Sequence, residues 1–314
     1  MKPTLSLIIP CYNEEESIQE THRRVTKVME DLAFPYEVVY VNDGSRDGTA
    51  ELLNTIQAED KAVRLIHFAA NRGHQVAVTA GLDYAQGEAA VILDADLQDP
   101  PEVIPEMVQK WQEGYQVVYG QRRSRQGESK FKLWTASAYY KLMQKLVGKN
   151  FHRDTGDFRL VDRRVVDAIK QMPEHARYLR GMFSWIGFKQ APVLYDRDKR
   201  FAGETHYPLK KMLKLAIDGI ISFSDKPLFI PILLGILLGG VSGIGLLALL
   251  VRLILGLQSG LWWLAAWVTM LFALLFMVIG IEGRYIDRIY REVQGRPLYF
   301  VAETRGFDTP SEEK

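Results

Sequence analysis

The chain has 314 residues, 47% of them hydrophobic and 25% charged, which is enough for one large folded domain or two smaller ones. The formal net charge of +1 excludes the strong basic excess of most nucleic-acid binders, so we expect no nucleic-acid partner. A single cysteine, Cys11, excludes an intramolecular disulfide framework and is typical of a reducing compartment. Glutamates at 14–16 interrupt any signal-peptide pattern, so we expect the first domain to stay in the cytoplasm.

Strand-like and helix-like segments alternate over the first 120 residues. The patterns predict strands at 5–10, 37–41, 63–68, 89–93 and 115–119, and helices at 17–32, from about 49, at 75–85 and after Pro100. This order is typical of an α/β fold, in which a mainly parallel sheet carries helices on both faces. Ligands bind such sheets at the carboxyl ends of the strands, and the polar clusters of this sequence lie at those ends.

Two apolar segments near the C-terminus, 228–251 and 260–281, contain no charged residue. Each is long enough to cross a bilayer core of about 30 Å as a helix, so we expect a two-helix transmembrane hairpin; a pair of buried core helices is the alternative. Lysines and arginines flank the outer ends of the pair, whereas only Arg252 lies at the connecting turn. The positive-inside rule therefore predicts a multi-pass protein with both termini in the cytoplasm.

Residues 205–227 alternate apolar side chains with lysines, which predicts an interfacial helix in contact with membrane lipids; a plain surface helix is the alternative. The predicted organisation is therefore a cytoplasmic domain at 1–204, this interfacial segment, the hairpin within 228–281, and a cytoplasmic tail at 282–314.

The strongest chemical signal is the sequence Asp94-Ala95-Asp96, which follows an apolar strand. Two carboxylates two residues apart at a strand end can reach one hard divalent cation, and Mg²⁺ is usually held by one or two carboxylates together with substrate phosphates. A turn with solvated carboxylates is the alternative interpretation.

A second carboxylate, Asp43, ends the second predicted strand, beside the first. It can accept hydrogen bonds from a nucleobase or a ribose, although simple turn chemistry remains the alternative. The stretch from Pro10 to Glu14 ends the first strand and is placed to form a wall of the same nucleoside site; capping of the next helix is its alternative role. No G-x-G-x-x-G follows that strand, which disfavours a dinucleotide-binding oxidoreductase.

Together these motifs resemble the family-2 glycosyltransferases with the GT-A (Rossmann-like) fold, in the polyprenyl-phosphate branch that includes dolichol-phosphate mannose synthases and bactoprenol glucosyltransferases. The resemblance covers nearly the whole chain. The matching pieces are Ile9-Pro10-Cys11-Tyr12-Asn13-Glu14, Asn42-Asp43-Gly44-Ser45, Asn71-Arg72-Gly73, Asp94-Ala95-Asp96-Leu97-Gln98-Asp99-Pro100, Gly156-Asp157-Phe158-Arg159-Leu160 and Arg200-Phe201-Ala202-Gly203-Glu204-Thr205. One departure is His74, which stands where many relatives carry lysine or another polar residue.

The resemblance implies a site for a nucleotide-sugar donor and a Mg²⁺ or Mn²⁺ ion. The implied donor site comprises Pro10, Tyr12, Glu14, Asp43, Asp94, Ala95, Asp96 and Arg200, and the implied metal ligands are Asp94, Asp96 and Gln98. It also places the protein in the bacterial inner membrane, with a polyprenyl phosphate as acceptor. The sequence leaves open whether a homo-oligomer forms.

Asp157 stands where relatives with hydroxyl acceptors carry a catalytic carboxylate. A phosphate monoester is already largely a dianion at neutral pH, so a base is redundant here. We expect Asp157 to hold the donor sugar or the acceptor geometry; a structural pair with Arg159 is the alternative. The acceptor phosphate needs cations, and Arg122 is the first candidate, followed by Lys130 and Lys132.

The predicted function is the inverting, metal-dependent transfer of a hexose, with glucose from UDP-glucose favoured, to undecaprenyl phosphate at the cytoplasmic leaflet. Mannose or a modified aminosugar on the same lipid carrier is one alternative, and a non-catalytic membrane scaffold is another. A processive polysaccharide synthase is disfavoured, because the chain lacks Q-x-x-R-W and a multi-helix pore.

Overall fold

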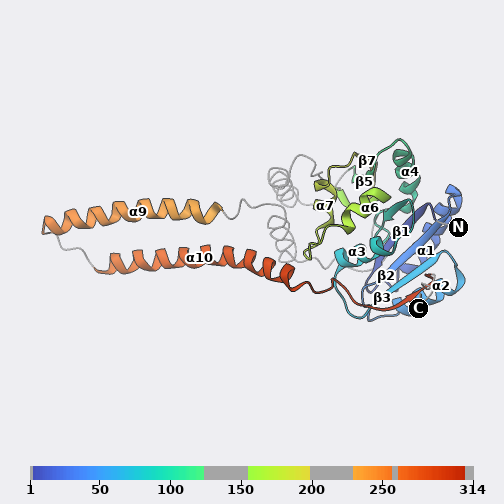
Figure 1. Ribbon diagram of the computed structural model, residues 1–314, viewed down its shortest axis with the longest axis horizontal. Coiled ribbons are helices and arrows are strands. Elements are labelled where there is room, and N and C mark those ends of the chain that lie inside the picture. The colour runs from blue at the N-terminus through green and yellow to red at the C-terminus, as the bar shows by residue number, and fades with distance from the viewer. Residues whose placement is uncertain (1–2, 124–154, 199–228, 257–260, 308–314) are drawn as a thin grey trace, which may run out of the picture. The chain divides into compact units, whose positions relative to one another are not determined.

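The computed structural model describes residues 3–123, 155–198, 229–256 and 261–307 (Figure 1). The chain divides into two compact units, the first formed by Met1–Ala216 with Pro297–Lys314 and the second by Ile217–Arg296. Residues 282–314, predicted as one tail, are thus divided, because 282–296, most of them in helix α10 (Leu261–Gln294), belong to the second unit and Pro297–Lys314 belong to the first. The predicted interfacial helix at 205–227 lies outside the described residues.

The first unit is built on a sheet with the strand order β7-β5-β6-β4-β1-β2-β3-β8. Its strands are β1 (Leu5–Cys11), β2 (Tyr36–Asn42), β3 (Val63–Phe68), β4 (Ala89–Ile92), β5 (Val117–Arg122), β6 (Thr155–Asp162), β7 (Gln190–Tyr195) and β8 (Val301–Arg305). The pairings of β1 with β2 and β4, of β2 with β3, and of β5 with β7 are parallel. Only β6 and β8 run against the other strands of this sheet. The expected mainly parallel sheet is confirmed.

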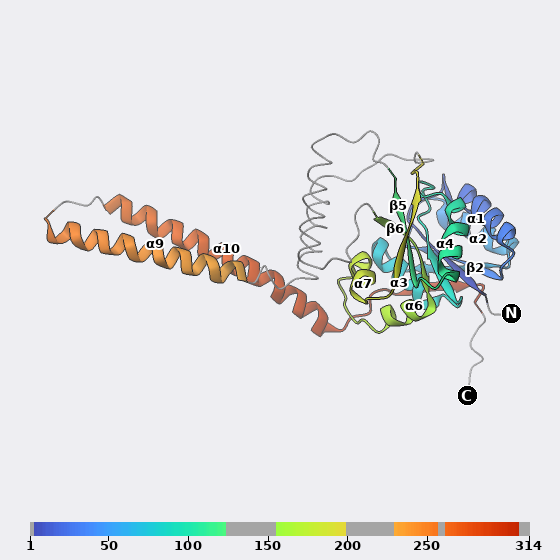
Figure 2. The ribbon, with the colours of Figure 1, turned by 90° about the horizontal axis from the view of Figure 1, so that it is seen from above.

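Helices cover both faces of this sheet, as Figure 2 shows. One face carries α1 (Ile18–Leu32), α2 (Thr49–Glu59) and, after the short helix η1 (Pro101–Val103), α4 (Ile104–Gln112); the other carries α3 (His74–Tyr84), α6 (Arg163–Lys170) and α7 (Leu179–Trp185). Strand residues alternate between the two layers, because successive side chains point to opposite faces. Parallel strands buried on both faces read as continuous apolar runs, which is why β1, β2 and β4 stand out in the sequence.

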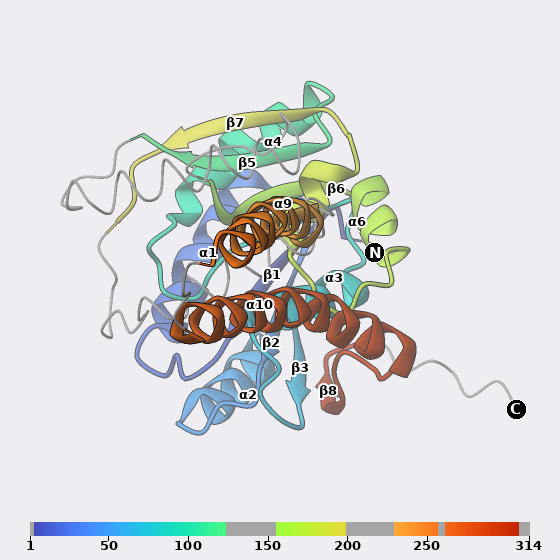
Figure 3. The same cartoon turned by 90° about the vertical axis from the view of Figure 1, so that its left-hand side faces the viewer.

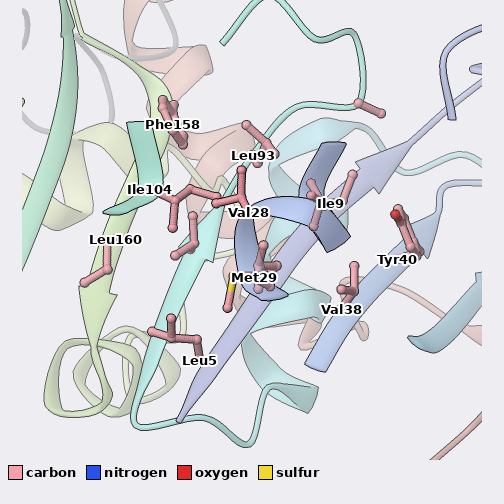
Figure 4. Packing of buried hydrophobic residues seen from close by; sticks show 14 of the residues in the cluster. Leu5, Ile9, Val28, Met29, Val38, Tyr40, Leu93, Ile104, Phe158 and Leu160 are labelled. Carbon is pink, nitrogen blue, oxygen red and sulfur yellow. The ribbon is translucent and has the colours of Figure 1, made fainter. Parts of the chain in front are cut away.

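The larger core packs α1 and α4 against the sheet, with Leu5, Ile9, Val28 and Met29 among its buried members (Figure 4). On the opposite face, helix α3 approaches β1 closely. A Cβ atom added to Gly81 would lie 2.2 Å from Cγ2 of Ile8, so only glycine fits at that position without a shift.

The strand β8 pairs antiparallel with β3 at the edge of the sheet, where Figure 3 shows the two side by side. Tyr299, just before β8, stacks on Phe68 with ring centroids 5.0 Å apart and donates a hydrogen bond to Asp83 at 2.9 Å. The segment after the last long helix therefore completes the fold of the first unit and covers an otherwise open sheet edge.

The second unit contains α9 (Phe229–Ile254) and α10, which lie side by side and antiparallel (Figures 1 and 2). Within the described residues, one stretch, Leu233–Arg252 of α9, satisfies the length and hydropathy expected of a membrane span. The two-span hairpin and the position of both termini stay predictions.

Candidate active site

A cavity of about 880 Å³ lies in the first unit, at the carboxyl ends of β1, β2 and β4. Of the predicted site residues, Pro10, Tyr12, Glu14, Asp43, Asp94, Ala95, Asp96 and Asp157 line it. The opposite wall comes from the loop 71–73, the start of α3 and the segment 175–180. Gln98 and Arg122 are not among its lining residues, and Lys130, Lys132 and Arg200 lie outside the described part of the chain.

The turns after β1 and β2 are tied to each other, which fixes one end of the cavity. The Asn13 N–H donates to Ser45 Oγ at 3.0 Å, and Asn13 Oδ1 accepts from the Arg46 N–H at 2.9 Å. Asn13 adopts a left-handed φ of 56°, a conformation that asparagine tolerates better than most residues. The adjacent Tyr12 keeps 42% of its surface exposed, which leaves its ring available for a ligand.

Asp43 is buried, and both of its carboxylate oxygens accept backbone N–H bonds, from Arg72 at 2.6 Å and Gly73 at 2.8 Å. Burial raises the pKa of Asp43, while these two bonds oppose the rise. The side-chain hydrogen bond of the turn, which was the alternative role for Asp43, is made by Asn42, whose side chain accepts from the Ser45 N–H at 3.0 Å. Each oxygen of Asp43 keeps a further lone pair, which can accept from a nucleoside.

Asp94 and Asp96 both face the cavity, but they have different partners. Asp94 Oδ1 lies 2.7 Å from Nε2 of His74, and Asp96 Oδ1 accepts from the backbone N–H of Gln98 at 3.1 Å. Burial alone would lower the pKa of His74, but the Asp94 carboxylate raises it to about 9. In return, the charged imidazole holds the pKa of Asp94 below its usual value against the effect of burial.

The described residues contain no group of three or more Cys, His, Asp or Glu side chains arranged to hold a metal ion. Two cavity carboxylates without a third protein ligand suit Mg²⁺ or Mn²⁺ that takes its remaining ligands from substrate phosphates and water. The chemistry of the donor set therefore fits the implied ion, and the assignment of Asp94 and Asp96 as its protein ligands stays a prediction.

Asp157 is buried and forms a bidentate pair with Arg180, at 2.8 and 3.0 Å. Gln75 donates to the same carboxylate at 3.3 Å. Burial would raise the pKa of Asp157, but the Arg180 guanidinium, followed by the His74 imidazole, holds it well below the usual range. Asp157 is therefore a fixed anion rather than a group poised to take up a proton.

The structural pair suggested for Asp157 and Arg159 is wrong, because Arg159 bonds to backbone oxygens, Gly156 O at 2.9 Å and Asp157 O at 3.3 Å. Its guanidinium stacks on the ring of Phe183 at 4.6 Å. The partner that the sequence did not reveal is Arg180, which lies on α7, 23 residues from Asp157. No local pattern marks that pairing, because it joins α7 to the start of β6, two elements that are separate in the sequence.

Arg122 lies at the end of β5, beside a buried group of polar residues. Its Nη2 is 3.7 Å from Oδ1 of Asp99, which is also 3.7 Å from Nε of Arg197 and accepts a 2.5 Å hydrogen bond from the Tyr195 hydroxyl. A Cβ atom at Gly156 would lie 3.3 Å from Arg122 Nη2, so Arg122 is adjacent to the strand that delivers Asp157 to the cavity.

A doubly covered α/β sheet with carboxylates lining a cavity at its strand ends is typical of α/β enzymes, which bind their ligands at this edge. Residues 6–170 match the family described as Glycosyl transferase family 2. The chain belongs to this family and is a glycosyltransferase. It is 47% identical over 308 residues to the uncharacterized glycosyltransferase YkcC of Bacillus subtilis, covering 96% of this chain and 94% of that protein.

Two further similarities extend this assignment. The chain is 37% identical to the prophage bactoprenol glucosyl transferase homolog of Escherichia coli, over 96% of this chain and 99% of that protein. A crystal structure of glucosyl-3-phosphoglycerate synthase from Mycobacterium tuberculosis, in complex with Mn²⁺, uridine diphosphate and phosphoglyceric acid, matches with a TM-score of 0.51 and 20% identity, over 70% of this chain and 76% of that one. The expected GT-A fold is confirmed.

Proposed function

We propose that this enzyme transfers glucose from UDP-glucose to undecaprenyl phosphate, with inversion, at the cytoplasmic leaflet of the bacterial inner membrane. The observation that carries the proposal is the single cavity that Asp43, Asp94, Asp96 and Asp157 line together. Glucose and a polyprenyl carrier are favoured over mannose or a modified aminosugar because full-length relatives carry the name bactoprenol glucosyl transferase. The apolar helix α9 is consistent with a lipid acceptor.

On the donor side, the ends of β1 and β2 would hold the nucleoside. Tyr12 offers an exposed ring for the base, and Asp43 offers acceptor lone pairs for a base N–H or a ribose hydroxyl. Asp94 and Asp96 would hold a Mg²⁺ or Mn²⁺ ion, which when bound stabilises the negative charge that develops on the nucleoside diphosphate as the sugar C1–O bond breaks; the third ligand expected from the sequence, Gln98, does not line the cavity.

On the acceptor side, a phosphate dianion attacks the sugar without losing a proton. The fixed Asp157–Arg180 pair would then position the donor sugar or the acceptor, and the Arg122 guanidinium would bind the acceptor phosphate, with Lys130 and Lys132 as further candidates. Attack from the face opposite to the leaving diphosphate gives inversion.

The test uses the purified full chain, radiolabelled UDP-glucose, UDP-galactose or GDP-mannose, undecaprenyl phosphate and Mn²⁺ or Mg²⁺, followed by lipid extraction. We expect labelled lipid from UDP-glucose, and loss of about 10²–10³ in rate when Asp96 is replaced by asparagine, as for other electrostatic stabilisers. Asp31→Asn, at an exposed position on α1, is the matched control and should keep wild-type turnover.

Two outcomes would overturn separate parts of the proposal. Labelled lipid from GDP-mannose alone would refute the donor, and full activity in excess EDTA would refute the divalent ion. The anomeric configuration of the sugar phosphate, measured by NMR, checks inversion.

A further inference from the structure

Arg122 belongs to a cluster with Asp99, Tyr195 and Arg197. Neither the sequence motifs nor the donor cavity assigns a role to this cluster. Asp99 is 1% exposed and lies among the ends of β5 and β7. Its Oδ1 accepts the Tyr195 hydroxyl at 2.5 Å and lies 3.7 Å from both Arg122 Nη2 and Arg197 Nε. One buried carboxylate thus faces two guanidinium groups.

The packing around Tyr195 holds its hydroxyl in one place. A Cβ atom at Gly120 would lie 2.8 Å from Cε1 of Tyr195, and the Phe158 ring meets the tyrosine edge-on with centroids 5.7 Å apart. The backbone is fixed as well, because Tyr195 O accepts from the Arg123 N–H at 3.0 Å. A ring that cannot move makes its hydroxyl a fixed anchor for Asp99.

Asp99 in turn restrains Arg122. The side chain of Arg122 is 23% exposed, and its buried Nε has no hydrogen-bond partner within the described structure. The direction of the guanidinium therefore depends on the attraction of its Nη2 to Asp99, on its interaction with the Tyr195 hydroxyl and on the close approach that Gly156 permits. Without the carboxylate, a long arginine side chain would occupy several rotamers.

Asp99 also belongs to the loop that carries the donor carboxylates. The Gln98 N–H donates to Asp96 at 3.1 Å, and Gln98 O accepts from the Asp198 N–H at 3.0 Å, just beyond β7. The loop 94–99 is thus bonded both to itself and to the segment that follows Tyr195, so the positions of Asp96 and Arg122 are fixed relative to each other.

We propose that Tyr195 and Asp99 are positioning residues that hold the Arg122 guanidinium for an anionic phosphate acceptor, at a set distance from the donor carboxylates. This inference rests on the proposed function, in which Arg122 binds the acceptor. Tyr195→Phe is the sharpest perturbation, because it removes one hydroxyl and keeps the ring packed against Gly120 and Phe158. Tyr40→Phe is the matched control: Tyr40 is a buried tyrosine on β2, and its hydroxyl lies 3.2 Å from Nδ1 of His22 on α1.

Tyr195→Phe should raise the KM for undecaprenyl phosphate about two- to tenfold, the range that corresponds to one intramolecular hydrogen bond. The Kd for UDP should stay unchanged, since the donor cavity is untouched. Asp99→Asn, which keeps the shape and removes the charge, should raise the same KM. Tyr40→Phe should change the melting temperature at most and leave the acceptor KM at its wild-type value.

A double-mutant cycle separates this inference from the proposed function. If Tyr195 acts through Arg122, adding Tyr195→Phe to Arg122→Ala should cause no further rise in acceptor KM. A normal acceptor KM in Tyr195→Phe and Asp99→Asn, or additive effects in the double variant, would overturn the inference while the acceptor role of Arg122 stands. An unchanged acceptor KM in Arg122→Ala would instead overturn the acceptor site of the proposed function, and the inference with it.

Discussion

Replacement of Arg180 by alanine would leave the buried Asp157 carboxylate without the guanidinium that occupies both of its oxygens. Removing one partner of a fully buried pair costs about 3–5 kcal/mol. The Arg180 side chain is 33% exposed, and Gln75 and His74 remain 3.3 and 3.8 Å from the carboxylate, so we expect a smaller loss of about 2–3 kcal/mol at neutral pH.

The pH dependence gives this prediction its sign. In the wild type the pKa of Asp157 is held well below its usual value. The pair therefore contributes fully to the free energy of unfolding above about pH 4, the approximate pKa of an aspartate in the unfolded chain. That contribution is lost as pH falls through the lower pKa of the folded state. In Arg180→Ala, burial without the guanidinium raises the pKa of Asp157. Protonation then relieves the unpaired charge, and the stability difference from wild type should narrow as pH falls from 7 towards 4.

Thermal unfolding of the detergent-solubilised protein between pH 4 and 8 measures this difference. Arg164→Ala is the control, because its partner Asp162 lies in an exposed pair at 2.9 Å that should contribute at most about 1 kcal/mol. A stability loss in Arg180→Ala that is absent at pH 7, or that grows towards acid pH, would refute the reasoning.

Asp157→Asn should lower the rate of glycosyl transfer without removing a limb of the pH–rate profile near neutrality. A lost limb would make Asp157 a general base.

Three further outcomes are expected, two from the structure and one from the sequence. The stability contributed by His74 beside Asp94 should be complete below pH 6.5 and disappear as pH rises through about 9, and His74→Gln should remove that step from melting curves recorded in EDTA. Gly81→Ala should destabilise the protein by about 1–3 kcal/mol through the clash with Cγ2 of Ile8, and combining it with Ile8→Ala, which removes that atom, should cost less than the sum of the two single substitutions in denaturant titrations. From the charge distribution of the sequence, reporter fusions at Lys2 and Lys314 should both give cytoplasmic signals; a periplasmic signal at Lys314 with a cytoplasmic one at Lys2 would contradict the two-span hairpin.

The sequence predicts the parallel part of this fold well because that part is encoded locally. Strands buried on both faces appear as apolar runs, and parallel strands place their carboxyl ends on one edge, so Asp43, Asp94 and Asp96 were expected to meet. All three line one cavity in the structure. Their roles in binding donor and metal stay predictions.

The features that the sequence did not predict depend on partners distant in the chain. The strand β8 has a largely exposed side-chain pattern and is identifiable only because β3 offers a free edge. In the same way, the pairing of Arg180 with Asp157 comes from the packing of α7, and the contact between Tyr195 and Asp99 joins positions 96 residues apart. Such pairings carry no periodic or motif signal, so a single sequence does not indicate them.

The loop from Asp94 to Asp99 connects these separate parts of the site. Asp94 bonds to His74 at the start of α3, and Asp99 bonds to Tyr195 beside Arg122. Between them, Leu97 is buried and adopts a left-handed φ of 58°, a conformation that costs a bulky residue about 1–3 kcal/mol. Such strain persists only where surrounding contacts overdetermine the backbone. We therefore interpret Leu97 as the bend in the loop that directs Asp94 towards the donor cavity and Asp99 towards Arg122, the proposed acceptor-binding residue.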